Sequence, residues 1–121
     1  MNEELVIDRT KIFAHRCVKA AIALNKTQLG GIISKQLMRS ATSVAANYRA
    51  ACLAHSKEAF TSKLSIVIEE ADESEFWLTF ALDEKLLKPK QVEGLIAESK
   101  ELCSIFVSSR KTIQIAKTNN K

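Results

Sequence analysis

The stretch that decides the fold runs from Gln36 to Leu78 and reads QLMRSATSVAANYRAACLAHSKEAFTSKLSIVIEEADESEFWL. Its first half carries small or polar residues where a packed helix usually carries large aliphatic ones: Ser40, Ala41, Ser43, Ala45, Ala46, Asn47, Ala50 and Ala51. A helix with such small side chains can approach its neighbours closely. The second half is acidic on one side and aromatic at its end. The stretch therefore predicts two long helices separated by one break.

Apolar periodicity predicts four helices in a single domain spanning residues 1–121. The first is expected over about Asp8–Asn25 with Asp8 as its N-cap, and the second over about Ile32–Ala54. The pair Gly30-Gly31 should close a loop over Lys26–Gly31. Ser56 is the expected N-cap of the third helix, Asp83–Lys88 the next turn, and Pro89 the first residue of the fourth helix. Short connections favour an all-α, up-down antiparallel four-helix bundle, and Lys117–Lys121 should fray.

Steps of three and four residues define the expected core faces. They comprise Ile12, Phe13, Cys17, Ala20 and Leu24; Ile33, Leu37, Ala41, Val44, Tyr48 and Cys52; Phe60, Leu64, Val67, Ala71, Ser74, Leu78 and Leu82; and Val92, Leu95, Ile96, Ser99, Leu102, Cys103, Phe106 and Ile113. The three cysteines all fall within these faces, so we expect small buried hydrophobes that stay free in a reducing compartment.

The net charge of +4 is segregated along the chain. Residues 1–63 hold ten lysines and arginines against four acidic residues, whereas residues 64–101 hold four against ten. Two interpretations stay open: complementary packing between helices or subunits, and a basic face for a polyanion. The candidate nucleic-acid contacts are Arg9, Lys11, Arg16, Lys19, Arg110 and Lys111. No signal peptide or membrane-spanning run is recognisable, so we expect a cytoplasmic protein without membrane contact.

Catalytic and metal-binding patterns are missing from the sequence. Neither of the two histidines, His15 and His55, has a second ligand at the spacing of a metal site. Glu69, Glu70 and Glu73 lack a matching histidine. We therefore expect no enzyme activity, catalytic residue, metal or cofactor. The alternative is a small metal-dependent or enzymatic helical bundle.

Arg39, Ser43 and Asn47 follow one another at steps of four on the second helix. Together with Glu70 and Glu73 of the third helix they predict a hydrogen-bonded network that fixes helix register, so that Arg39→Ala or Asn47→Leu should lower thermal stability sharply. The alternative is that Arg39 and Asn47 contact a ligand or an RNA phosphate. The aromatic side chains outside the core, Phe76, Trp77 and Phe80, predict an oligomer interface.

These motifs resemble a family of four-helix-bundle proteins encoded in intervening sequences of bacterial large-subunit ribosomal RNA genes. The likeness rests on Arg39, Ser40, Ser43, Val44, Ala46 and Asn47; on Ser56, Phe60 and Leu64; on Glu70, Ala71, Glu73 and Trp77; and on Glu101, Leu102 and Ile105. Lys85 departs from it, because many relatives carry glycine there.

The resemblance implies a ring-shaped homopentamer with no enzyme activity and no established substrate. A distant relative, the accessory variability determinant of diversity-generating retroelements, shares the architecture. Its basic surface is thought to engage nucleic acid and a reverse transcriptase. We therefore expect a non-enzymatic scaffold that assembles with itself and binds RNA or DNA weakly, with a reverse transcriptase as a partner by distant analogy.

Overall fold

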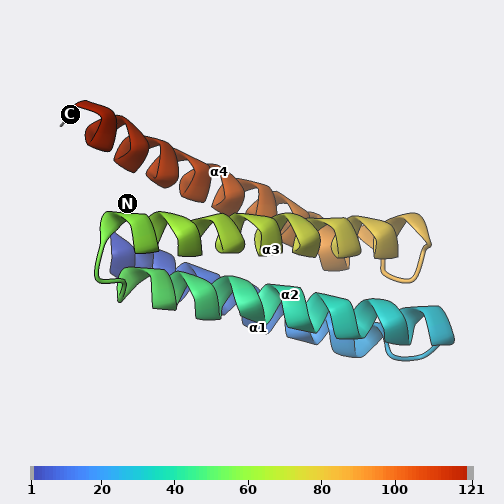
Figure 1. Ribbon diagram of the computed structural model, residues 1–121. Helices are drawn as coiled ribbons and strands as arrows, with labels where there is room; N and C mark the ends of the chain where they lie inside the picture. Colours follow the sequence, from blue (N-terminus) through green and yellow to red (C-terminus); the bar gives the residue numbers. More distant parts are fainter. Residues whose placement is uncertain (1, 120–121) are drawn as a thin grey trace.

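The computed structural model describes residues 2–119, with side chains up to residue 116, and contains four helices and no strand within that range. They are α1 (Glu3–Leu24), α2 (Gln28–Cys52), α3 (Lys57–Asp83) and α4 (Pro89–Asn119). Consecutive helices pack side by side with opposite directions, and α4 also contacts α1 (Figure 1). The all-α four-helix prediction is thus confirmed. Toward its C-terminal end, α4 diverges from α3 (Figure 1). It remains helical to Asn119, and the rest of the expected frayed tail lies outside the described residues.

Helix α1 begins five residues earlier than the sequence predicted. The Asn2 side chain, not that of Asp8, caps it by accepting a hydrogen bond from the Leu5 backbone N–H at 2.9 Å. Glu3 and Glu4 place negative charge in the first turn, where the helix dipole favours it. This earlier start adds Val6 to the buried residues. The core of α1 therefore begins closer to the N-terminus than Phe13.

Gly30 and Gly31 belong to the first turn of α2, so the predicted loop over Lys26–Gly31 was right for Lys26 and Thr27 and wrong from Gln28 onward. Thr27 is the N-cap, and its hydroxyl accepts from the Gly30 N–H at 2.9 Å. A Cβ at Gly30 would lie 1.9 Å from the Leu24 carbonyl oxygen. The glycine therefore permits close contact between α2 and the end of α1 instead of breaking a helix. At its other end α2 stops at Cys52, two residues before the predicted Ala54.

Helix α3 begins and ends with two recognisable caps. The Ser56 hydroxyl accepts from the Ala59 N–H at 3.0 Å, as the sequence predicted. At the other end, the Leu86 N–H donates to the Ala81 carbonyl and the Lys85 N–H to the Leu82 carbonyl, each at 3.0 Å. This pattern is a Schellman motif, which requires a left-handed residue after the helix. Lys85 supplies it with φ 59°.

The predicted faces form most of the core, with a few exceptions. Phe13, Leu37, Leu64 and Phe106 are fully buried. The rings of Tyr48 and Phe106 join α2 to α4, with centroids 5.4 Å apart. Ile12 was placed wrongly: it is 57% exposed, because the next residue, Phe13, takes the inward position. The remaining partial exceptions are half-buried at the margin of the core: Cys52, Phe60, Leu82, Ile96, Cys103 and Ile113.

Candidate interaction surfaces

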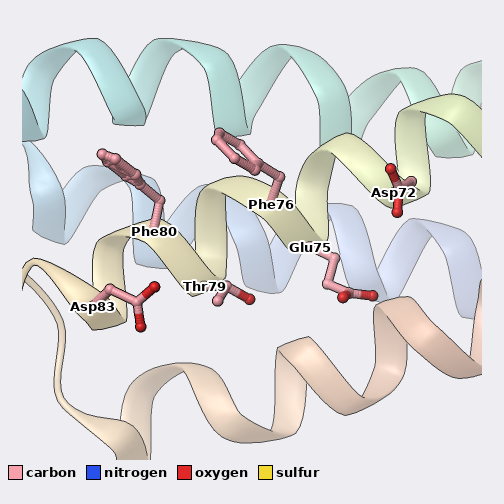
Figure 2. Close-up of a pocket in the computed structure, with 6 residues that line it drawn as sticks. All are labelled: Asp72, Glu75, Phe76, Thr79, Phe80 and Asp83. Atoms are coloured by element: carbon pink, nitrogen blue, oxygen red, sulfur yellow. The ribbon is translucent and has the colours of Figure 1, made fainter.

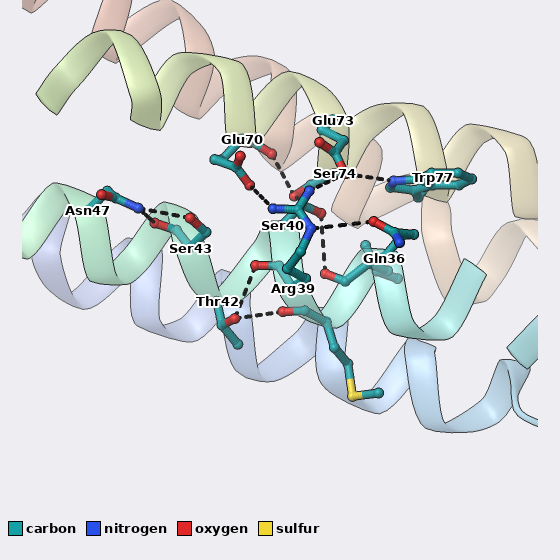
Figure 3. Close-up of polar contacts among 12 residues, drawn as sticks. Gln36, Arg39, Ser40, Thr42, Ser43, Asn47, Glu70, Glu73, Ser74 and Trp77 are labelled. Atoms are coloured by element: carbon teal, nitrogen blue, oxygen red, sulfur yellow. Dashed lines mark hydrogen bonds and ion pairs between the residues drawn. The ribbon is translucent and has the colours of Figure 1, made fainter. Parts of the chain in front are cut away.

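Arg39 of α2 joins two carboxylates of α3 (Figure 3). Its Nη1 donates to Glu70 Oε2 at 3.0 Å and its Nη2 to Glu73 Oε2, while its Nε donates to Gln36 Oε1 at 3.3 Å. The Trp77 indole N–H also donates to Glu73, at 3.0 Å. The structure therefore brings together three of the five residues of the predicted network, and adds Gln36 and Trp77 to them.

The electrostatics of this network favour ionised side chains at the surface. Burial raises the pKa of Glu73, but the hydrogen bonds from Trp77 and Arg39 outweigh it and hold that pKa below its usual value. The Arg39 side chain is nevertheless 49% exposed. Exposed ion pairs contribute about 0–1 kcal/mol to stability. The expectation of a sharp stability loss in Arg39→Ala assumed a buried network and does not fit this geometry.

Ser43 and Asn47 do not join the network across the two helices. The Asn47 side-chain amide donates to the Ser43 carbonyl at 2.9 Å and to the Ser43 hydroxyl at 2.8 Å, both within α2 (Figure 3). A side chain that bonds one turn back along its own helix does not fix register against another helix. This part of the predicted network was wrong.

The buried polar contact between α2 and α3 is made instead by two serines. The Ser40 and Ser74 hydroxyl oxygens lie 3.0 Å apart, and both residues have no exposed surface. The apolar periodicity correctly places Ser74 in the core stripe, but its pairing with Ser40 was not predicted. The signal was available, since a serine at an inward position of a regular apolar stripe requires a hydrogen-bond partner.

Phe76, Trp77 and Phe80 form one aromatic cluster on α3. Ring centroids lie 4.9 Å apart for Phe76 and Trp77, 5.8 Å for Phe76 and Phe80, and 6.3 Å for Trp77 and Phe80. Trp77 and Phe80 are half-buried against the core, whereas Phe76 is 57% exposed. A hollow of about 300 Å³ runs along this helix face, lined by Asp72, Glu75, Phe76, Thr79, Phe80 and Asp83. Figure 2 shows the two phenylalanines pointing toward α2 and Thr79 and Asp83 pointing to the opposite side.

The candidate nucleic-acid residues lie on different helices and at different contacts between helices. Arg9 is held by α4: it makes two hydrogen bonds of 2.8 Å to the Glu98 carboxylate and an ion pair of 2.9 Å with Glu101. The hydrogen bonds that Arg9 donates to Glu98, and next those to Glu101, raise the pKa of Arg9. Its donors therefore bind the chain's own carboxylates, and Arg9 does not fit a phosphate contact.

The other five cations are not gathered into one patch. Arg110 of α4 donates to the Ser65 hydroxyl of α3 at 3.3 Å, and Lys111 beside it is exposed. Arg16 of α1 lies against Gly94 of α4, since a Cβ there would be 3.2 Å from Arg16 Nη2. Lys19 is exposed on α1, and Lys11 lies at the border with α2.

Potential nucleophiles and metal ligands do not converge among residues 2–119. Burial raises the pKa of the Cys17 thiol to about 12 and those of Cys52 and Cys103 to about 11, so all three are thiols near neutral pH. In the same range, no group of three or more His, Cys, Asp or Glu side chains is placed to hold a metal ion. A hollow of about 400 Å³ beside the α2–α3 turn includes Cys52, His55 and Ser56. Cys52 is not activated there.

The sequence profile of the family described as "23S rRNA-intervening sequence protein" matches residues 3–108. The chain belongs to this family. The match covers all of α1, α2 and α3 and most of α4, so the residues that carried the resemblance all lie inside it.

A solved structure supports the fold of this member of the 23S rRNA-intervening sequence protein family. It is a protein of unknown function from the S23 ribosomal protein family of Bacteroides thetaiotaomicron, and it is 34% identical to this chain. The alignment covers 92% of this chain and 99% of the other, with a TM-score of 0.84. No curated protein sequence matches the chain. None of the helices in the described range is both long and apolar enough to cross a membrane.

Proposed function

We propose that this protein is a non-enzymatic scaffold that assembles with copies of itself, as a closed ring of five. The observation that carries the proposal is the aromatic cluster of α3. Phe76 is 57% exposed in the single chain, although it packs edge-on against Trp77. Aromatic residues are enriched at interface cores, where they combine a large contact area with few rotatable bonds. The number of copies follows the family resemblance.

The direct test of this cluster replaces Phe76 by glutamate. A charge at the centre of an interface costs several kcal/mol when its partner surface is apolar. We expect Phe76→Glu to sediment as a single chain at micromolar concentration while keeping its helical circular-dichroism signal. Val107→Glu is the matched control, because Val107 is also exposed (41%) but lies on α4. If Phe76→Glu sediments like the unmodified protein, the aromatic cluster is not the interface.

Weak binding of RNA or DNA is the second candidate function, supported by the exposed cations of α1 and α4 and by the net charge of +4. The test is an anisotropy titration with a single-stranded oligonucleotide at about 50 and 200 mM salt, a range over which phosphate contacts lose much of their affinity. We expect sequence-tolerant binding that falls steeply with salt. Phe13, the aromatic residue closest in sequence to the α1 cations, is fully buried, so base stacking should add little. Absence of binding at the lower salt would remove this candidate and leave the scaffold.

A further inference from the structure

The border between α1 and α2 contains a groove that complements the acidic, aromatic face of α3. The groove has a volume of about 270 Å³ and is lined by Ile7, Lys11, Ala14, His15, Thr42, Ala45, Ala46 and Arg49. Three of its lining residues are alanines, whose short side chains leave space between the two helices, and they are called the alanine floor below. Lys11 and Arg49 are both exposed and carry positive charge on its rim.

The α3 face has the opposite charge and projecting side chains. Phe76 stands out from the helix, and Asp72, Glu75 and Asp83 line the hollow around it. These lining residues recur at steps of three and four from position 72 to position 83, so they follow one helix face for roughly 16 Å at a rise of about 1.5 Å per residue. The groove is somewhat shorter, about 12 Å along α1 from Ile7 to His15 at the same rise per residue.

These charges have no ion-pair partner among the side chains that the structure describes, those of residues 2–116. Ion pairs among residues 2–116 include those of Arg9 with Glu98 and Glu101 and those of Arg39 with Glu70 and Glu73. Lys11 and Arg49 on one surface, and Asp72, Glu75 and Asp83 on the other, are not among them. The two surfaces belong to different borders of the same chain, so they can meet only between two copies.

We infer that the α3 face of one copy docks into the α1–α2 groove of the next, with Phe76 and Phe80 against the alanine floor and the carboxylates beside Lys11 and Arg49. This inference rests on the proposed self-assembly and names its two surfaces. A contact between two different patches is heterologous, and such contacts generate closed rings when the rotation between copies closes. A two-fold dimer, in which each patch meets itself, would instead place carboxylates against carboxylates.

Charge reversal on each surface tests the pairing. The groove variant is Lys11→Glu with Arg49→Glu, and the α3 variant is Asp72→Lys with Asp83→Lys. All four residues are exposed, so each variant should fold, which circular dichroism checks. Reversal places like charges opposite one another, and we expect each variant to raise the dissociation constant for self-association at least about tenfold. The chain with all four substitutions restores opposite charges and should assemble like the unmodified protein.

The control is Lys19→Glu with Lys35→Glu, which changes the net charge as the groove variant does but alters exposed lysines outside the groove. Its mass by light scattering should equal that of the unmodified protein. Rescue by the fourfold variant supports the pairing. If the unmodified protein assembles but the groove variant keeps the same mass, the docking inference is wrong and self-assembly stands. An unchanged mass with lost oligonucleotide binding would assign the groove to a polyanion instead. An unmodified protein that is a single chain overturns both proposals.

Discussion

The Ser74 hydroxyl of α3 lies 3.0 Å from the Ser40 hydroxyl of α2, in the fully buried interior of the bundle. Each hydroxyl is also close to a carbonyl of its own helix, Ser74 to that of Glu70 at 2.9 Å and Ser40 to that of Leu37 at 3.3 Å. Whichever serine donates across the interface, both oxygens keep a partner. The pair thus satisfies two polar groups in the α2–α3 contact and occupies very little volume.

Replacing Ser74 by alanine should therefore be mild. Ser40 retains its bond to the Leu37 carbonyl, so only one hydrogen bond is lost, worth about 0.5–1.5 kcal/mol. Ser74→Leu should destabilise more, because added volume in a tight core typically costs about 1–3 kcal/mol. Urea denaturation at one fixed protein concentration measures both, since assembly makes stability depend on concentration. Equal losses in the two variants would show that space is not limiting there.

Arg9 and Arg39 each bind two glutamates, but they differ in burial. The Arg9 side chain is 23% exposed and that of Arg39 is 49% exposed. Arg9→Ala leaves Glu98, which is 17% exposed, without its two hydrogen bonds from Arg9, and we expect a loss of about 1–3 kcal/mol. Arg39→Ala is the matched control and should cost about 0–1 kcal/mol. A loss in Arg39→Ala equal to that in Arg9→Ala would contradict the ranking by exposure.

Replacing Lys85 by glycine should stabilise the protein. Its left-handed backbone, φ 59°, costs a residue with a Cβ about 1–2 kcal/mol, and the Schellman motif at the end of α3 requires that conformation. Glycine also has more conformational freedom in the unfolded chain, which offsets part of this gain. We therefore expect Lys85→Gly to raise the free energy of unfolding by about 0.5–1 kcal/mol in thermal denaturation. Lys85→Ala keeps the Cβ and should stay within about 0.5 kcal/mol of the parent. A destabilised Lys85→Gly would argue against this turn geometry.

Gly30 should not tolerate alanine, whereas Gly94 should. A Cβ at Gly30 meets the Leu24 backbone oxygen at 1.9 Å, so α1 and α2 would have to separate. We expect Gly30→Ala to cost about 1–3 kcal/mol. At Gly94 the Cβ meets only the far end of Arg16, at 3.2 Å, and alanine favours the helix. Thermal melts of both variants check this difference, and a Gly30→Ala protein as stable as the parent would contradict the close approach.

Sequence periodicity was sufficient for the helices and the core, but not for helix ends and polar partners. The stripe from Leu64 to Leu78 was correct because it follows directly from helical geometry. Gly30 was misplaced because local propensity cannot show that the end of α1 would lie against it. Arg9 was assigned to nucleic acid because its partner Glu98 is 89 positions away in the chain. Periodicity places a charge on a face but does not identify the charge opposite.

Self-assembly through exposed surfaces of the bundle sets the mass of the unmodified protein in solution. Size-exclusion chromatography with multi-angle light scattering at micromolar concentration gives that mass without assuming a shape. We expect a single species of about five times the 13.4 kDa of one chain. A species of 13.4 kDa that persists when the concentration is raised about tenfold would show that the protein does not assemble with itself.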